Sequence, residues 1–140
     1  MSMTNEEMNG WNQQIIAEFR ANGGKVASFG DAPMVILHST GAKSGKEREN
    51  PLVALVEGDD MYLIASKAGA PTHPDWYHNL KANPQAEIEY GTERFAVEAT
   101  EVTGADRDAV YARQVAAQPG FADYEKATTR VIPVFSLTRL

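Results

Sequence analysis

The spacing of apolar residues predicts a long amphipathic helix over about residues 4–22. Its apolar positions are three or four residues apart and therefore share one face of a helix. They are Met8, Trp11, Ile15 and Phe19. Thr4 and Glu7 fit the pattern in which two side chains satisfy backbone N–H groups at a helix start. The charged residues of its polar face are three glutamates, Glu6, Glu7 and Glu18, and one arginine, Arg20. An anionic membrane would repel this face, so we expect the helix to pack on the protein's own core.

After this helix the pattern changes to short apolar runs, which predict six strands. The expected strands cover residues 34–37, 51–56, 61–65, 86–90, 95–99 and 130–137. Turn-forming residues at 57–60 and 91–92 indicate two hairpins. Two further helices are expected over residues 75–81 and about 105–118, each followed by a proline that ends it.

This order of elements predicts a mainly β (α+β) protein. Six strands with tight hairpins and few helices between them do not fit a doubly wound parallel sheet. They fit an antiparallel sheet that closes into a small barrel with helices on the outside. No repeat or linker divides the sequence, so we expect one domain over residues 1–140, with the barrel at about 33–139.

Composition narrows the class of protein. A chain of 140 residues, 43% of them hydrophobic, can form a core without disulfides. A net charge of −6 argues against a general nucleic-acid binder, and the absence of cysteine excludes thiolate sites and cysteine nucleophiles. No apolar run approaches the roughly 20 residues that span a bilayer, and the start does not resemble a signal peptide. We therefore expect a cytoplasmic protein without stable membrane insertion.

Familiar catalytic motifs are missing from the sequence. The three histidines, His38, His73 and His78, show no metal-binding spacing, and we expect no metal site. No serine lies in a G-x-S-x-G motif, and paired catalytic carboxylates cannot be chosen among nineteen scattered acidic residues.

Residues 39–51, with the sequence STGAKSGKERENP, combine glycines, hydroxyl groups and three cations within six positions. Backbone N–H groups, hydroxyls and cationic side chains together bind anions, of which phosphate is the obvious example. The segment is not a P-loop, because the required lysine spacing is absent and a strand follows. Spacing alone leaves two interpretations open, an anion site or a solvated hairpin loop.

Residues 65–71, with the sequence ASKAGAP, form a second loop of small residues, whose backbone a flat ligand can approach closely. The segment HPDWYHNLKANP follows, and in a barrel both loops would be able to face one cleft. Trp76 and Tyr77 in this segment have two interpretations, the wall of that cleft or core packing of a short helix.

The two loops, together with TTRVIPVF near the end, resemble the deazaflavin (coenzyme F-420)-dependent nitroreductase family in order and spacing. The resemblance covers about residues 8–138. It implies a six-stranded split β-barrel of the FMN-binding-split-barrel type. It also implies an oxidoreductase that transfers a hydride from reduced coenzyme F-420, an 8-hydroxy-5-deazaflavin, to an electron-poor small molecule.

The expected acceptors are quinones, nitro compounds, and enones or unsaturated lactones such as coumarins. Xenobiotic reduction would follow from this range. The expected assembly is a monomer or a homodimer. Two alternatives stay open: an FMN-dependent oxidoreductase on the same barrel, and a carrier protein that binds the deazaflavin without catalysis.

The resemblance also implies roles for particular residues. The coenzyme's phosphodiester and acidic tail would be held by Lys43, Ser44 and Arg48, with Lys46, Asn50 and Pro51 completing the first motif. Lys46 would compensate for Ala42, where many relatives carry a cation. The deazaflavin ring would lie along Ser66, Lys67, Ala68, Gly69 and Ala70, and the wall on the cofactor side would be Pro74, Trp76 and Tyr77.

The expected acceptor pocket contains Phe121 and Tyr124. Some relatives carry a tyrosine where this chain has Phe121, which cannot donate a proton. Tyr124 is therefore the candidate catalytic residue.

Overall fold

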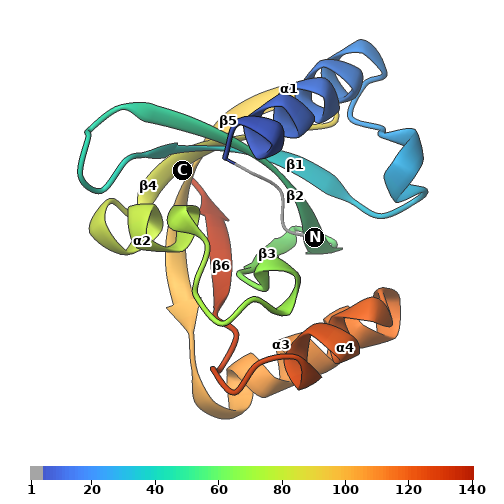
Figure 1. The fold of residues 1–140 in the computed structure, drawn as a ribbon, viewed down its shortest axis with the longest axis vertical. Helices are drawn as coiled ribbons and strands as arrows, with labels where there is room; N and C mark the ends of the chain where they lie inside the picture. Colours follow the sequence, from blue (N-terminus) through green and yellow to red (C-terminus); the bar gives the residue numbers. More distant parts are fainter. Residues whose placement is uncertain (1–4) are drawn as a thin grey trace.

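The computed structural model describes the backbone of residues 5–140 and the side chains of residues 10–140 except that of Ala68. Six strands form a closed barrel in which every neighbouring pair is antiparallel (Figure 1). Around the barrel they are β1 (Met34–Thr40), β2 (Glu47–Glu57), β3 (Asp60–Ile64), β6 (Val134–Arg139), β5 (Glu93–Val102) and β4 (Gln85–Tyr90). The expected antiparallel barrel is confirmed.

Within residues 5–140, four α-helices lie around this barrel (Figure 1). They are α1 (Asn5–Ala21), α2 (Asp75–Ala82), α3 (Gly104–Ala117) and α4 (Gly120–Lys126), and two short 3-10 helices are η1 (Ala27–Phe29) and η2 (Lys67–Gly69). The predicted cap by Thr4 and Glu7 and the predicted packing of Met8 fall outside what the structure describes. Within the described residues, no helix combines the length and apolar character needed to cross a membrane.

Helix α1 packs on the outer face of β1, as its apolar spacing predicts. Phe19 and Ile15 are buried against Met34 and Ile36, which point outward from the barrel on alternate positions of the strand. The prediction is wrong for Trp11, which is 45% exposed although its spacing places it near the apolar face. The buried face instead includes Ile16, so it is shifted around the helix from the face that the spacing predicts.

Helix α2 closes one end of the barrel interior. The inward positions of β1, among them Val35 and Leu37, belong to the same core as Trp76 and Leu80 of the helix. The ring of Trp76 lies 6.1 Å from the ring of Phe135 on β6, measured between centroids. The apolar side chains of this short helix therefore cover one end of the barrel core.

Helix α3 covers another part of the outer face of the barrel, where Val110 and Tyr111 are buried against Ile64 and Ile132. Helix α4 folds back from its end, and the sequence analysis missed it. We had interpreted Pro119-Gly120 only as a helix end, whereas Pro119 sits in the helical region at φ −57° and begins a new turn.

Two predicted boundaries are wrong. The last strand begins at Val134 and not at residue 130, because Val131 is 71% exposed and Pro133 has no N–H to donate to the ladder. The first loop is also shorter than residues 39–51, since β1 continues to Thr40 and β2 begins at Glu47. Only residues 41–46, here called the β1–β2 turn, lie outside the strands.

Candidate functional site

The first residues of β2 alternate between two faces of the barrel wall. Arg48 pairs with Ser39 and Asn50 pairs with Leu37. Leu37 belongs to the core inside the barrel, so the side chains of Ser39, Arg48 and Asn50 also point to that side. Glu47 and Glu49 occupy the intervening positions and therefore point to the outer face. The sequence KEREN is thus divided by strand geometry into a cationic and polar inner set and an acidic outer set.

The β1–β2 turn is held by its own hydrogen bonds. The N–H of Gly41 donates to the carbonyl of Lys46 at 2.7 Å, and the N–H of Gly45 donates to the carbonyl of Gly41 at 2.9 Å. Ser44 Oγ accepts from the N–H of Lys46 at 3.2 Å and lies 3.5 Å from an Nη atom of Arg48. A Cβ atom at Gly41 would lie 2.5 Å from that Oγ, so a larger residue here would displace the Ser44 hydroxyl.

Asn79 joins the β1–β2 turn to helix α2. Its Oδ1 accepts a hydrogen bond from the N–H of Ala42 at 2.9 Å, and its Nδ2 lies 3.4 Å from Ser39 Oγ. The side chain is 7% exposed and lies on the buried face of the helix with Trp76 and Leu80. Sequence reasoning did not assign a role to Asn79, although a polar residue on the apolar face of a short helix was a usable signal.

Residues 65–70, here called the η2 loop, are organised by Arg130. The guanidinium donates from Nε to the carbonyl of Ala70 at 2.8 Å, from Nη2 to Ser66 at 2.7 Å and from Nη1 to Ala65 at 3.2 Å. Nη1 also lies 3.0 Å from Nδ1 of His73. Arg130 belongs to the TTRVIPVF motif, but these partners lie too far away along the chain to be inferred from that motif.

The conformation of the η2 loop is strained and tightly packed. Lys67 has φ 48°, a left-handed value that is unfavourable for a residue other than glycine. A Cβ atom at Gly69 would lie 2.8 Å from the Cβ of Ala127 and 2.9 Å from the carbonyl oxygen of Tyr124. Backbone strain of this kind concentrates at functional sites.

Helix α4 brings the two residues of the expected acceptor pocket beside the η2 loop. Phe121 and Tyr124 are half-buried, and their rings meet edge to face with centroids 5.0 Å apart. The hydroxyl of Tyr111 on α3 donates to the carbonyl of Phe121 at 2.5 Å. Burial raises the pKa of Tyr111 to about 12, so this phenol remains a donor at neutral pH.

The expected wall residues are divided between core and surface. Trp76 is 5% exposed and Pro74 is also buried, so the core interpretation describes Trp76 best. Tyr77 is half-buried, and its ring lies 4.3 Å from the ring of His73. Burial and the nearby charge of Arg130 lower the pKa of His73, which favours the neutral ring that can accept a hydrogen bond from Arg130.

The arginines of the described residues fall into two groups, those paired with a carboxylate and those without such a partner. Five arginines form ion pairs with carboxylates, namely Arg20, Arg94, Arg107, Arg113 and Arg139. Within the described part of the chain, Arg48 and Arg130 have no such partner, nor do the turn lysines Lys43 and Lys46. Uncompensated cations, a hydroxyl and backbone N–H groups in a chain of net charge −6 suit an anionic ligand.

Helix α2 connects the two loops, because Asn79 contacts the β1–β2 turn and His73, just before the helix, contacts Arg130. The structure therefore brings the two predicted segments to the end of the barrel that α2 closes (Figure 1). The predicted residues that are exposed there are Lys43, Ser44, Lys46, Arg48 and Lys67. Those that are half-buried are Asn50, Pro51 and Ala70. Ser66 and Gly69 are buried, and the side chain of Ala68 is outside the described set.

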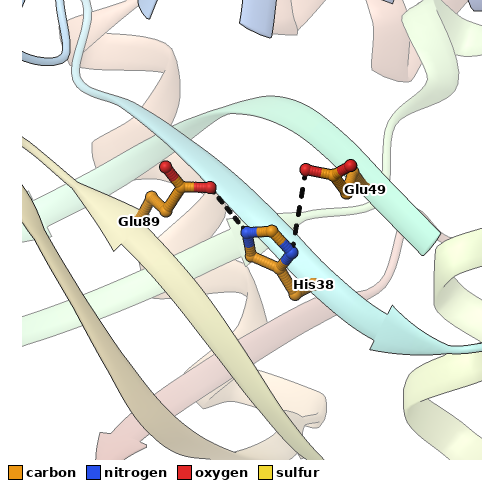
Figure 2. A group of neighbouring side chains, drawn as sticks. All are labelled: His38, Glu49 and Glu89. Carbon is orange, nitrogen blue, oxygen red and sulfur yellow. Dashed lines mark hydrogen bonds and ion pairs between the residues drawn. The ribbon is translucent and has the colours of Figure 1, made fainter. Parts of the chain in front are cut away.

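A second polar cluster lies on the outer face of the barrel, where His38 stands between Glu49 and Glu89 (Figure 2). His38 is 5% exposed, and its Nε2 lies 2.6 Å from Glu89. These three residues have the donor types of a metal site. However, an Nη atom of Arg20 lies 2.7 Å from both carboxylates and would have to be displaced by a metal ion.

Arg20 also lowers the pKa of Glu89 to about 2, mainly through their hydrogen bond. We therefore interpret the cluster as an ion-pair network that fastens α1 to β2 and β4. A groove of about 430 Å³ lies beside this cluster and reaches Gly45 of the β1–β2 turn. Its charged lining residues are Glu47 and Glu87, which do not suit an anionic tail.

Comparisons with known proteins show which family the chain resembles. Residues 11–139 match the family described as F420H(2)-dependent quinone reductase. An F420H(2)-dependent quinone reductase of Mycobacterium tuberculosis is 39% identical over 128 residues, which are 88% of this chain and 86% of the relative.

Two solved structures are also similar. One is an F420-H2 dependent reductase, with 40% identity, a TM-score of 0.69 and coverage of 76% of this chain and 94% of its own. The other is described as a domain-swapped dimer, with 35% identity, a TM-score of 0.71 and coverage of 94% of this chain and 99% of its own. The chain therefore belongs to the F420H(2)-dependent quinone reductase family, a family of F-420-dependent oxidoreductases.

Proposed function

We propose that this protein reduces a quinone with reduced coenzyme F-420, and that the coenzyme binds at the barrel end formed by the β1–β2 turn, the η2 loop and α2. The observation that carries the proposal is the placement of Arg48 and Arg130. They are the arginines without a carboxylate partner in the described residues, and they serve the two loops that α2 joins. The relative from M. tuberculosis, named as a quinone reductase, supports the choice of acceptor.

The β1–β2 turn suits the coenzyme's phosphodiester and acidic tail. Lys43, Lys46 and Arg48 supply positive charge, and Ser44 supplies a hydroxyl that already accepts from the backbone. Charge-assisted hydrogen bonds to phosphate are among the strongest polar contacts. Asn79 holds the turn in place from α2, which reduces the entropy that ordering the turn on binding would cost.

The η2 loop suits the flat deazaflavin ring. Its residues are mostly small, which leaves room for a flat ring to lie along the loop. Gly69 lets the loop itself pack closely against Ala127 and Tyr124. When bound, reduced F-420 supplies the hydride, and the protein supplies position and electrostatics. Holding the ring against a rigid loop raises the effective concentration of the hydride donor near the acceptor. This is the main contribution to catalysis of a site that positions its reactants.

Phe121 and Tyr124 from α4 would line the acceptor pocket beside the η2 loop. Tyr124 carries the hydroxyl of this pair, and we propose that it stabilises or protonates the reduced acceptor. A Tyr124→Phe variant should lower the rate with several acceptors while leaving F-420 affinity unchanged. An unchanged rate would remove Tyr124 from the mechanism.

The acceptor range and the assembly are further parts of the proposal. We propose that nitro compounds and unsaturated lactones such as coumarins are accepted besides quinones, because the expected pocket offers one hydroxyl and aromatic surface rather than a specific polar pattern. A similar structure is described as a domain-swapped dimer, and we propose that this chain forms a homodimer. Light scattering after gel filtration tests the homodimer against the monomer.

The central experiment is a titration of the purified protein with oxidised and reduced F-420, with FMN and NADPH in parallel. F-420 should bind, and FMN should bind weakly or not at all. The Lys43→Ala/Arg48→Ala variant should bind F-420 at least about a hundredfold more weakly, since each charged hydrogen bond contributes about 1.5–3 kcal/mol. Its rate in the saturated complex should change little.

A matched control removes two cations elsewhere. Lys81 and Arg113 pair with Glu101 and Glu57 on the surface, so Lys81→Ala/Arg113→Ala changes the net charge equally. Equal affinity in both double variants would refute the anion site. Tight F-420 binding without reduction of any acceptor would instead favour the carrier protein.

A further inference from the structure

Arg130 is the only residue in the described structure whose side chain donates to three backbone carbonyls, and all three belong to the η2 loop. These contacts cross 60 to 65 positions of sequence. We propose that Arg130 is a positioning residue that sets the shape of the η2 loop and thereby the affinity for the ring of the deazaflavin, but not for its tail. This inference rests on the proposed function.

The chemistry of the guanidinium explains why arginine is needed at this position. Its planar fork presents donors in fixed directions, and here they meet the carbonyls of Ala65, Ser66 and Ala70 at 2.7 to 3.2 Å. A lysine ammonium is a compact point charge and cannot reach carbonyls that lie along two sides of a planar group. Arginine at 130 therefore has no conservative substitute.

The η2 loop depends on this support because its own hydrogen bonds are few. The N–H of Gly69 donates to the carbonyl of Ser66 at 2.9 Å, and the N–H of Ala70 donates to that of Lys67 at 3.0 Å. Lys67 is held at a left-handed φ of 48°, which persists only where the surroundings impose it. Without Arg130, the carbonyls of Ala65 and Ala70 lose the donors that face them.

The orientation of the guanidinium distinguishes Arg130 from the cations of the β1–β2 turn. Most of its donors are directed to backbone carbonyls and to Nδ1 of His73. Arg48 and Lys43, by contrast, are exposed and point no donor at a backbone carbonyl in the described structure. Arg130 therefore shapes a surface, whereas the turn cations are available to grip an anion.

Two ligands separate these roles experimentally. Coenzyme F-420 carries the ring and the tail, and a tail-less 8-hydroxy-5-deazaflavin carries the ring without phosphate. Dissociation constants for both are measured with the full-length protein and with Arg130→Lys and Arg130→Gln. Arg113→Lys is the matched control, because this exposed arginine contacts only the surface carboxylate of Glu57 and the ring of Tyr62.

Amide hydrogen exchange without any ligand provides a readout that does not depend on the coenzyme. In Arg130→Lys, the amides of Gly69 and Ala70 should exchange at least about tenfold faster than in the parent protein. Both ligands should bind at least about tenfold more weakly. In Lys43→Ala/Arg48→Ala, only F-420 should bind more weakly, and exchange in the η2 loop should be unchanged.

Each outcome either supports or overturns the positioning role of Arg130. Unchanged exchange in Arg130→Lys overturns the proposal, and so does weaker binding of F-420 with unchanged binding of the tail-less ring. If the parent protein binds neither ligand, the proposed function fails, but the exchange rates still show whether Arg130 shapes the loop. Should Arg130→Gln fail to fold, Arg130→Lys decides the result, because it retains the charge and the length of the side chain.

Discussion

Asn79 Oδ1 accepts a hydrogen bond at 2.9 Å from the backbone N–H of Ala42, so a buried side chain of α2 fixes the position of the β1–β2 turn. The same amide reaches Ser39 Oγ on β1 at 3.4 Å. The turn that carries the proposed tail-binding cations is thus tied to the helix that closes the barrel. Changes inside α2 are therefore expected to alter binding at the surface.

The first prediction concerns Asn79→Ala. This substitution should weaken F-420 binding about five- to tenfold, because a turn that has lost one hydrogen bond of about 1 kcal/mol must be ordered by the ligand. It should also lower the free energy of unfolding by about 1–2 kcal/mol, since a buried polar contact is removed. Fluorescence titration and urea denaturation measure the two effects.

Lys81→Ala on the same helix is the control for Asn79→Ala, because its side chain is exposed and pairs only with Glu101. It should change neither affinity nor stability by a measurable amount. Equal affinities in the two variants would show that the turn does not need α2.

The second prediction compares Gly69→Ala with Gly58→Ala. Both glycines have positive φ, 81° and 62°, so both substitutions carry the cost of a left-handed alanine, about 1 kcal/mol. Only at Gly69 does the new Cβ collide with neighbours, 2.8 Å from Ala127 and 2.9 Å from the carbonyl of Tyr124. Gly69→Ala should therefore lower stability by about 1–3 kcal/mol more.

Gly69→Ala should also alter the KM for the acceptor, because it pushes α4 away from the η2 loop. Thermal unfolding and steady-state kinetics with a quinone measure the two effects. If the two alanine variants are equally stable, the close packing of η2 on α4 does not exist in solution.

The third prediction concerns Gln114 on α3, which is fully buried and has no hydrogen-bond partner for either amide atom among the described residues. Leaving buried polar atoms unpaired costs about 1–3 kcal/mol. Gln114→Met keeps the length and removes the amide, so it should raise the free energy of unfolding by about 1–2 kcal/mol. Denaturant titration measures this, with the exposed Gln85→Met as the control.

A loss of stability in Gln114→Met would mean that the amide is paired in solution and contributes to the fold. In that case the packing of α3 on the barrel would differ from the description above.

The fourth prediction concerns acid stability. Arg20 holds the pKa of Glu89 at about 2, below its ordinary value of 4.5. A carboxylate with a lowered pKa stabilises the folded state above its ordinary pKa, and this contribution disappears as the pH falls towards the folded value. Arg20→Met should therefore be less stable at pH 7, and its difference from the parent should shrink between pH 4.5 and 2.

The matching control is Arg113→Met, which breaks an exposed pair with Glu57 and should have little effect at either pH. Denaturant titrations at several pH values give the comparison. A difference for Arg20→Met that stays constant down to pH 2 would contradict the ion-pair network around His38.

Much of the fold could be predicted because it is encoded locally. Apolar runs and turn residues indicated six strands, and three of the four helices follow from their spacing and their ends. Helix α4 was missed because its seven residues have no buried face to produce a periodic signal. The start of β6 was placed too early because Val131 is apolar but exposed.

Only part of the candidate site could be predicted from the sequence. The loops were visible as unusual segments of glycine, hydroxyl and cation, but the residues that shape them act across long stretches of sequence. Asn79 meets Ala42 across 37 positions, and Arg130 meets the η2 loop across 60 or more. Which cations lack a carboxylate is likewise a property of the folded surface, because it depends on which strands become neighbours.

The alternation of β2 leaves the protein vulnerable to a shift in strand register. Arg48 and its neighbours Glu47 and Glu49 point to opposite sides of one thin wall. A slip of β2 by a single residue against β1 would exchange the two sides, placing glutamate at the proposed coenzyme site and arginine beside His38. An insertion or deletion in the β1–β2 turn would therefore invert the electrostatics of the site, even though the composition of the strand stayed the same.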